Sequence, residues 1–183
     1  ARIDHVVAWI EENQPDVLAL QETKVVDDLF PYAAFESLSY SVEAFGQKSY
    51  NGVANITKNS SSDTKKGIRG FDDPQTRVIS TTHEDIRVVN VYVPNGQSVG
   101  SDKFEYKLSW LDHLKKMLRN DLKKHSKMVI LGDFNIAPRD EDVHDPEKWR
   151  DKILCSAQER VMFEEILSMG FHDSFRLFEK GAG

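Results

Sequence analysis

The stretch Met128-Val129-Ile130-Leu131-Gly132-Asp133-Phe134-Asn135 decides the predicted fold and concentrates the chemistry of the chain. Its four apolar residues, two of them β-branched, predict a strand that is buried on both faces. Because residues two apart in an extended backbone point to the same side, Asp133 and Asn135 are expected to face one spot. Such a pair can orient a water, hold a metal or bind an oxyanion. The alternative is an ordinary strand-to-loop turn, which Gly, Asp and Asn all favour.

Composition and charge are typical of one globular domain. At 183 residues, with 39% hydrophobic and 30% charged residues, the chain is long enough for a hydrophobic core. No apolar run approaches the ~20 residues of a membrane helix, and we expect no signal peptide. Cys155 is the only cysteine, which excludes an internal disulfide. The net charge of −6 argues against non-specific coating of polyanions but leaves a nucleic-acid enzyme open.

Hydrophobic periodicity predicts helices and strands along the whole chain. Helices are expected over residues 3–12, 104–122 and 158–169, and strands over 16–20, 53–56, 77–80, 87–93 and 128–131. The polar stretches 59–66 and 138–152 are expected to be exposed loops. One face of the long helix and its continuation carries five lysines, interpreted as a solvated face: Lys107, Lys115, Lys116, Lys123 and Lys124. With no internal repeat or boundary signal, residues 1–183 are predicted to form a single domain.

Three predicted strands end in polar residues suited to phosphate or metal chemistry. These residues are Glu22, Tyr92 with Asn95, and Asp133 with Asn135. Oxygen ligands without thiols suit Mg²⁺ or Mn²⁺, and Glu22 is the first candidate ligand. Asp133 is a candidate to orient or deprotonate an attacking water, and Tyr92 to donate to a phosphate oxygen or to stabilise a leaving group as phenolate. Taken singly, Glu22 also fits a solvated loop and Tyr92 a core aromatic.

Four ordered motifs resemble the exonuclease III family of abasic-site endonucleases. They are Leu18-Ala19-Leu20-Gln21-Glu22-Thr23-Lys24, Tyr50-Asn51-Gly52-Val53-Ala54, Asn90-Val91-Tyr92-Val93-Pro94-Asn95-Gly96 and Leu131-Gly132-Asp133-Phe134-Asn135-Ile136-Ala137-Pro138. They occur in the order of the family and at about its spacing, and the resemblance runs along essentially the whole chain. Four ordered motifs are far more specific than any one of them.

The resemblance implies an α/β fold, a four-layer αββα sandwich of two mixed β-sheets. It implies a metal-dependent phosphodiesterase of DNA base-excision repair that uses Mg²⁺ or Mn²⁺. Such an enzyme cuts double-stranded DNA 5′ to abasic sites and removes 3′ nucleotides or 3′ blocking groups. The expected protein is a cytoplasmic, nucleoid-associated monomer that binds no membrane.

By position in the motifs, the resemblance also implies residue roles. Glu22 matches the metal-binding glutamate, and the catalytic residues are Tyr92, Asp133 and Asn135. Three further residues match substrate-binding positions: Asn95, Tyr50 and Arg77. Lys107 is a weaker candidate for a position near phosphate.

Two family features have no counterpart in the sequence. The family begins with a strand that carries an asparagine metal ligand, and it ends with segments that carry a further aspartate and a catalytic histidine. We therefore expect an incomplete record of a longer protein, and residues 1–183 alone to be inactive and poorly stable, because sheet edges would be left unpaired. The alternatives are the same fold acting on a small phosphodiester or phosphoinositide, or a truncated, nonenzymatic remnant that binds DNA or protein.

Overall fold

The computed structural model describes residues 2–178, and the chain forms two compact units. The first unit comprises Ala1–Tyr92 and Leu122–Asp133, and the second comprises Val93–Asp121 and Phe134–Gly183. Each unit is described by itself below. The single-domain prediction stays a prediction, because compactness does not show whether a unit folds independently. Within residues 2–178, no helix combines the length and the apolar character needed to cross a membrane.

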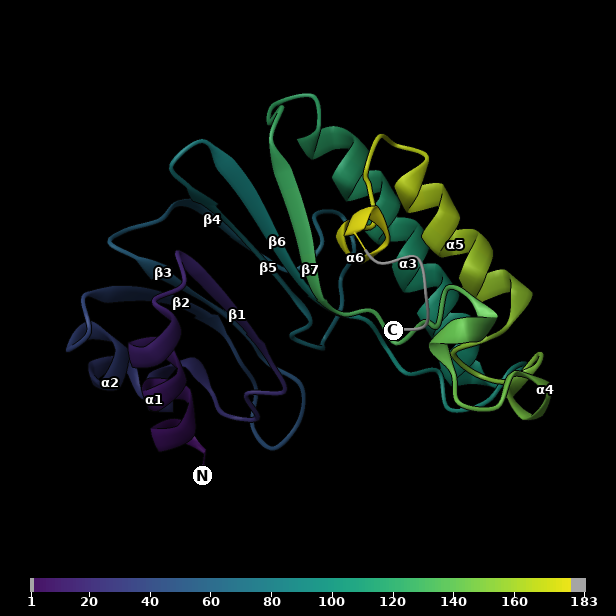
Figure 1. The fold of residues 1–183 in the computed structure, drawn as a ribbon, viewed down its shortest axis with the longest axis horizontal. Coiled ribbons are helices and arrows are strands. Elements are labelled where there is room, and N and C mark those ends of the chain that lie inside the picture. The colour runs from purple at the N-terminus through teal and green to yellow at the C-terminus, as the bar shows by residue number, and fades with distance from the viewer. Residues whose placement is uncertain (1, 179–183) are drawn as a thin grey trace. The chain divides into compact units, whose positions relative to one another are not determined.

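The first unit contains two sheets with helices over one of them (Figure 1). Its helical elements are α1 (Ile3–Asn13), η1 (Asp27–Leu29) and α2 (Tyr32–Glu36). Its strands are β1 (Val17–Gln21), β2 (Tyr40–Phe45), β3 (Val53–Lys58), β4 (Ser62–Lys66), β5 (Val78–His83), β6 (Ile86–Tyr92) and β7 (Met128–Asp133). One sheet has the order β1-β3-β2 and is antiparallel within the described residues. The other has the order β4-β5-β6-β7, and β7 runs parallel to β6.

Side-chain alternation along β3 explains how the two sheets pack. Ala54 and Ile56 point toward a core that includes Ile10 of α1 and Phe35 of α2. Asn55 lies between them in sequence and points to the opposite face, where its Nδ2 donates to Thr81 Oγ1 on β5 at 2.9 Å. The first unit therefore has three layers: the helices α1 and α2, the β1-β3-β2 sheet, and the β4-β5-β6-β7 sheet.

A buried asparagine joins the same two sheets near the ends of β1 and β6. Asn90 on β6 is fully buried, and its Nδ2 donates to the carbonyls of Leu20 and Ala54, both at 3.0 Å. Its Oδ1 accepts from Gln21 Nε2 at 2.8 Å. A buried amide is stabilised only when its donors and acceptor are paired, so this network favours one alignment of β6 against β1.

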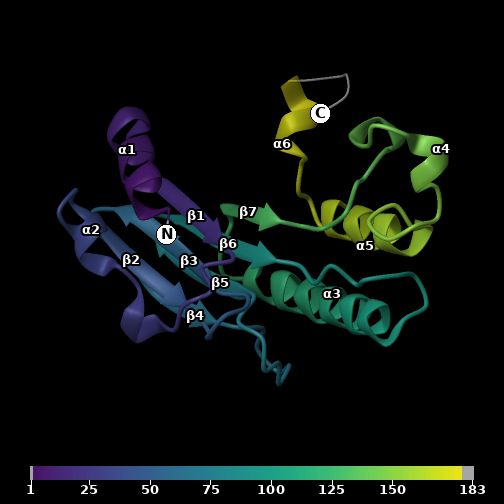
Figure 2. The same ribbon diagram turned by 90° about the horizontal axis from the view of Figure 1, so that it is seen from below.

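The second unit is helical in the part that the structure describes. Its elements are α3 (Asp102–Asp121), η2 (Asp140–Asp142), α4 (Pro146–Trp149), α5 (Ala157–Leu167) and α6 (Ser174–Phe178). Helices α3 and α5 lie side by side (Figures 1 and 2). The apolar face of α3 is buried, including Phe104, Trp110, Leu111 and Leu118.

Several expectations from the sequence are wrong in detail. Residues 62–66 form the strand β4 and not a loop. β4 is an edge strand with mostly exposed residues, so its sequence is polar and charged and resembles that of a loop. The stretch 138–152 contains η2 and α4. The strand β7 is not buried on both faces, because it lies at the edge of its sheet in the described residues, and Val129 is 47% exposed.

Candidate active site

Three strand ends in the first unit bring together the central predicted site residues. Tyr92 ends β6, Asp133 ends β7, and the two residues are register partners in the parallel pair. Glu22 follows β1 directly, and its Oε1 accepts a hydrogen bond from the Tyr92 hydroxyl at 2.6 Å. The Tyr92 phenol therefore lies next to the Glu22 carboxylate. The backbone of Tyr92 is paired with that of Asp133, which carries a second carboxylate.

The geometry of these strand ends depends on glycines within the motifs. Gly132 has φ +130°, and a Cβ there would lie 2.1 Å from the Val91 carbonyl oxygen, so only glycine lets β7 approach β6 just before Asp133. Gly52 has φ +92°, and a Cβ there would lie 2.1 Å from Thr23 Oγ1. The backbones of Asn51 and Gly52 accept from Lys24 N and Thr23 N at 2.9 and 3.2 Å. The second motif therefore supports the loop that carries Glu22.

The backbone of the Glu22 loop is itself unusual. Glu22 and Lys24 adopt φ values of 56° and 55°, a left-handed conformation that non-glycine residues rarely take. Such strain persists only where surrounding contacts over-determine the conformation, and it concentrates at functional sites. The loop is therefore held in one shape, and that shape presents the Glu22 carboxylate with 45% of its side chain exposed.

Charges around Glu22 and Tyr92 push their pKa values in opposite directions. Lys24 Nζ lies 2.6 Å from Glu22 Oε2, and this contact, followed by the hydrogen bond from Tyr92, lowers the pKa of Glu22. Desolvation, followed by the hydrogen bond to the Glu22 carboxylate, raises the pKa of Tyr92 to about 12. Tyr92 is therefore a protonated donor at neutral pH, and Glu22 is ionised.

Two predicted substrate-binding residues of the first unit lie in different surroundings. Arg77 packs its guanidinium over the Tyr92 ring at 4.6 Å, and its Nη1 donates to the Tyr92 carbonyl at 3.0 Å. Its Nε donates to Gln75 Oε1 at 2.7 Å. Arg77 is therefore held by Gln75 while its guanidinium stacks on the Tyr92 ring. Tyr50 is 71% exposed. Its suggested contact with DNA stays a prediction.

The remaining two predicted site residues form a pair in the second unit. Asn95 Nδ2 donates to Asn135 Oδ1 at 3.3 Å, and Asn135 Nδ2 donates to the Val93 carbonyl at 2.9 Å. Asn135 has φ 49°, and β7 ends at Asp133. The side-chain alternation used to place Asp133 and Asn135 on one side is therefore wrong, because the backbone is no longer extended at Asn135.

The interpretation of the lysines on α3 as a solvated face is also wrong for two of them. Lys107 is fully buried and Lys115 is 5% exposed. Lys107 pairs with Glu159 of α5, which sequence reasoning did not select. The readable signal was Ser156-Ala157-Gln158-Glu159, the spacing of a capping box, in which the structure shows both reciprocal hydrogen bonds.

The Glu22 carboxylate is an oxygen ligand of the kind that hard divalent cations prefer. Among residues 2–178, no three His, Cys, Asp or Glu side chains are grouped so that they could hold a metal. Mg²⁺ is commonly bound through one or two carboxylates and keeps several waters or substrate oxygens. The partly exposed carboxylate of Glu22 fits that type of site.

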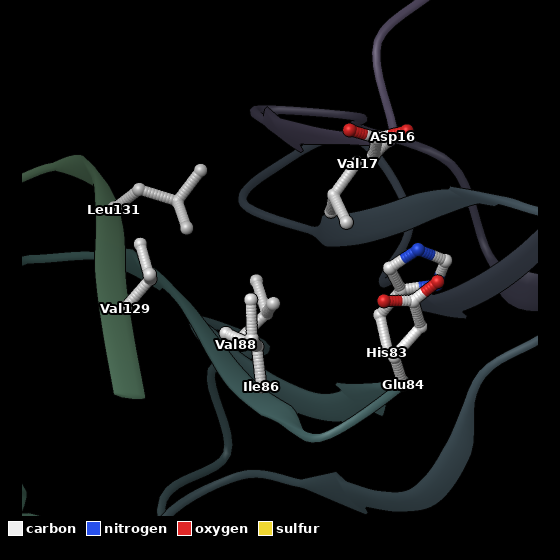
Figure 3. Close-up of a pocket in the computed structure, with 8 residues that line it drawn as sticks. All are labelled: Asp16, Val17, His83, Glu84, Ile86, Val88, Val129 and Leu131. Atoms are coloured by element: carbon white, nitrogen blue, oxygen red, sulfur yellow. The ribbon is translucent and has the colours of Figure 1, made fainter. Parts of the chain in front are cut away.

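A cavity of about 420 Å³ lies elsewhere in the first unit (Figure 3). Apolar side chains, among them Val88, Val129 and Leu131, line one side, and His83 and Glu84 lie beside each other on another (Figure 3). None of the predicted site residues lines it. The cavity is therefore separate from the Glu22–Tyr92 contact.

Comparison with known proteins decides the family. Residues 1–172 match the model of the endonuclease/exonuclease/phosphatase family. The chain belongs to this family. Its relatives include the exodeoxyribonuclease III of Haemophilus influenzae, which is 36% identical over 96% of this chain and 70% of the relative. This member of the endonuclease/exonuclease/phosphatase family is therefore of the exonuclease III type, and the prediction of a nuclease-type hydrolase is confirmed.

Solved structures confirm the fold of this family member. The 3′ phosphatase NExo from Neisseria, bound to a product DNA hairpin, matches with a TM-score of 0.94 and 44% identity over 96% of this chain and 69% of that one. An AP endonuclease from Archaeoglobus fulgidus matches with a TM-score of 0.91 and 37% identity over 96% and 68%. The predicted α/β sandwich is therefore confirmed.

Proposed function

We propose that the protein is a metal-dependent DNA phosphodiesterase of base-excision repair. It cuts double-stranded DNA 5′ to abasic sites and removes 3′ nucleotides or 3′ blocking groups. The names of the relatives support this substrate class, since they include an exodeoxyribonuclease III, a 3′ phosphatase bound to DNA and an AP endonuclease. The proposal includes a cytoplasmic, nucleoid-associated monomer whose residues 1–183 belong to one domain.

One observation carries the proposal. The Tyr92 phenol donates to the Glu22 carboxylate at 2.6 Å, while Tyr92 itself is the register partner of Asp133. The proposed cation ligand, the proposed donor and the candidate base therefore lie at the ends of three strands of one unit that are distant in sequence. Metal-assisted hydrolysis of a phosphodiester can use these three kinds of group.

Glu22 is the proposed ligand for Mg²⁺ or Mn²⁺. Its carboxylate is ionised and partly exposed, and Lys24 and Tyr92 occupy its two oxygens through contacts that a cation can replace. When bound, a divalent cation polarises the phosphate and stabilises the charge that develops on it.

The remaining roles follow from the protonation state and place of each side chain. Water attacks phosphorus and Asp133 takes a proton from that water. The bond from phosphorus to the 3′ oxygen breaks, and the 3′ oxygen leaves with its electron pair and takes a proton from solvent to become a hydroxyl. Tyr92 is proposed to donate to a phosphate oxygen, because desolvation and the hydrogen bond to Glu22 raise its pKa and keep the phenol protonated before a cation binds. Stabilisation of the leaving group as phenolate is the alternative. Asn135 is proposed to orient the water. Only one residue lies between it and Asp133, so the two Cα atoms are at most ~7 Å apart.

Three further residues are proposed to bind substrate. Asn95, which is hydrogen-bonded to Asn135, is proposed to lie near the scissile phosphate. Arg77, which stacks on the Tyr92 ring, is proposed to lie near the DNA backbone. Tyr50 is proposed to contact DNA with its exposed ring.

The substrate is tested with the full-length gene product and Mg²⁺. We expect cleavage of a duplex that carries one abasic site, release of 3′ nucleotides and 3′ phosphate, and loss of all activities in EDTA. The apparent affinity for DNA should fall steeply with salt concentration, because bound counterions are released from the phosphates. Activity on bis(p-nitrophenyl) phosphate or an inositol phosphate, without cleavage of DNA, would favour the small-phosphodiester alternative.

The roles are tested with Asp133→Asn and Glu22→Gln. Loss of the base or of the cation ligand should lower kcat about 10²- to 10⁴-fold. Asp85→Asn is the matched control, because Asp85 pairs with Lys127 on the surface of the same unit, as Glu22 pairs with Lys24. Unchanged turnover in both test variants would refute the assignments, and absence of nuclease activity in the wild type would favour a nonenzymatic protein.

A further inference from the structure

Lys107 is a buried lysine whose ammonium group donates to two backbone carbonyls and a carboxylate. Its side chain is fully buried on α3. Its Nζ donates to the Asn135 carbonyl at 2.6 Å, to the Asn95 carbonyl at 3.2 Å and to Glu159 Oε1. Lys107 is closed off from solvent in this structure, and the expectation that it lies near phosphate stays a prediction.

Glu159 is equally buried, and its carboxylate is tied to its own helix start. Oε1 accepts from Leu154 N at 3.0 Å, and Oε2 accepts from Ser156 N and Ser156 Oγ at 3.1 and 2.6 Å. Glu159 N donates back to Ser156 Oγ at 3.2 Å. The carboxylate is therefore fixed by the first turn of α5, and it fixes Lys107 in turn.

The two carbonyls that Lys107 holds belong to the two paired asparagines. Asn95 and Asn135 are 40 residues apart in sequence, and their side chains are hydrogen-bonded to each other. Asn135 also has a left-handed backbone, with φ 49°. A hydrogen bond to the carbonyl fixes the peptide plane that follows each asparagine and so restricts the direction of its side chain.

We propose that Lys107 and Glu159 form a positioning pair that holds the Asn95–Asn135 side-chain pair in one geometry. The assignment rests on the proposed function, because it matters for the reaction only if the asparagines act on water and phosphate. The proposed role of Lys107 and Glu159 requires no contact with substrate. Their effect reaches the reaction through the backbone of the two asparagines.

A second ion pair between the same helices provides a matched comparison. Lys115 of α3 is 5% exposed and pairs with Glu165 of α5. Its other ion-pair partner is Asp112, at 3.6 Å on α3 itself. Loss of Lys115 therefore removes an ion pair between α3 and α5 without removing a donor to Asn95 or Asn135.

The experiment compares Lys107→Met and Lys115→Met in the full-length gene product, at a temperature at which both are folded. We expect Lys107→Met to shift or broaden the side-chain amide signals of Asn95 and Asn135 in ¹⁵N NMR spectra. We also expect kcat on abasic duplex to fall about 10- to 100-fold with little change in KM, because misplaced groups lose orientation at the reacting centre. Lys115→Met should leave both amide signals unchanged and kcat within about twofold.

A double variant keeps the proposal testable if Lys107→Met does not fold. Replacement of both charges, in Lys107→Met with Glu159→Met, avoids an unpaired buried charge and is expected to restore stability. It does not restore a donor to the two carbonyls, so the asparagine signals should stay displaced.

The outcomes separate this proposal from the proposed function. Unchanged asparagine signals in a folded Lys107 variant overturn the positioning role. Displaced signals in a protein whose wild type does not cleave DNA support the positioning role and refute the proposed function. A similar fall in kcat for Lys107→Met and Lys115→Met reduces the pair to a helix–helix contact and overturns the proposal.

Discussion

Two lysine–carboxylate pairs of this chain differ in burial, and the difference separates two ways of building a site. Lys24 and Glu22 have side chains that are 55% and 45% exposed, whereas Lys107 and Glu159 are fully buried. The exposed pair can exchange partners, which a cation ligand requires. The buried pair cannot exchange partners, because each charge would lose its counter-ion in a place that solvent does not reach. The first pair thus suits chemistry, and the second suits the support of groups that do chemistry.

The largest difference between the pairs should appear in stability. Glu159→Ala removes the carboxylate that pairs with the buried Lys107 ammonium group, so we expect the free energy of unfolding to fall by about 3–5 kcal/mol. Urea unfolding of the full-length gene product measures it. Glu147→Ala is the control within the same unit, since Glu147 and Arg150 have exposed side chains and their pair should contribute less than about 1 kcal/mol. Equal losses in both variants would contradict the comparison.

The next effect concerns the phenol that shares Glu22 with Lys24. Tyr92→Phe removes the donor and keeps a ring for the Arg77 guanidinium to cover. We expect kcat to fall about 10²-fold while the protein stays folded, because one positioned donor in a transition state is worth roughly 3 kcal/mol.

The matched control for that variant is Tyr40→Phe. Tyr40 is a buried tyrosine of the same unit, and its hydroxyl donates to the Pro15 carbonyl at 2.7 Å. Tyr40→Phe should lower the free energy of unfolding slightly and leave kcat unchanged. The proposed role of Tyr92 does not survive if both substitutions reduce kcat alike.

The sequence identified the strand ends because their signals are local. Apolar runs predicted β1, β6 and β7, and polar residues at or just past their ends marked Glu22, Tyr92 and Asp133. The structure adds the Glu22–Tyr92 hydrogen bond, which joins residues 70 apart in sequence.

The buried pair was not predictable in the same way. Periodicity shows that α3 has an apolar face, but it does not show that α5 covers a polar position such as Lys107. Its partner Glu159 lies 52 residues away, and both side chains read as surface charges because isolated charged residues usually are exposed. The strand β4 was missed for a related reason, since its charged residues follow the rules for an exposed edge.

The pH dependence of Tyr92 gives a smaller effect with a definite sign. Its pKa is about 12 in the folded protein against an ordinary value of 10.0. The folded state therefore holds this proton more tightly, so its contribution to stability is complete below pH 10 and is lost as the pH rises toward 12.

We expect stability to fall between these pH values in the wild type, and by less in Tyr92→Phe, when both are measured without divalent cation. Glu22→Gln should lower the pKa of Tyr92, because the hydrogen bond to a carboxylate is one of the causes of the shift. An unchanged Tyr92 titration in Glu22→Gln, followed by ultraviolet absorbance, would contradict the coupling.

The smallest expected effect tests the exposed pair itself. In Lys24→Met, the pKa of Glu22 should rise toward its ordinary value, because the contact with Lys24 is the largest cause of its depression. A depressed carboxyl pKa contributes stability that is present above the unfolded value of 4.5 and is lost as the pH falls through the folded value. The variant should therefore lose less stability on acidification, with a change of under about 1 kcal/mol at neutral pH.

The control for this last variant is Lys127→Met, which breaks the exposed pair with Asp85. It should raise the pKa of Asp85, whose depression comes first from Lys127, and leave the NMR titration of the Glu22 carboxyl unchanged. Because an exposed lysine contributes little to stability, a loss in Lys24→Met as large as that in Glu159→Ala would mean that the Glu22 loop depends on its ion pair. Glu22 would then be fixed as Glu159 is, and a partner that cannot be exchanged would argue against Glu22 as a cation ligand.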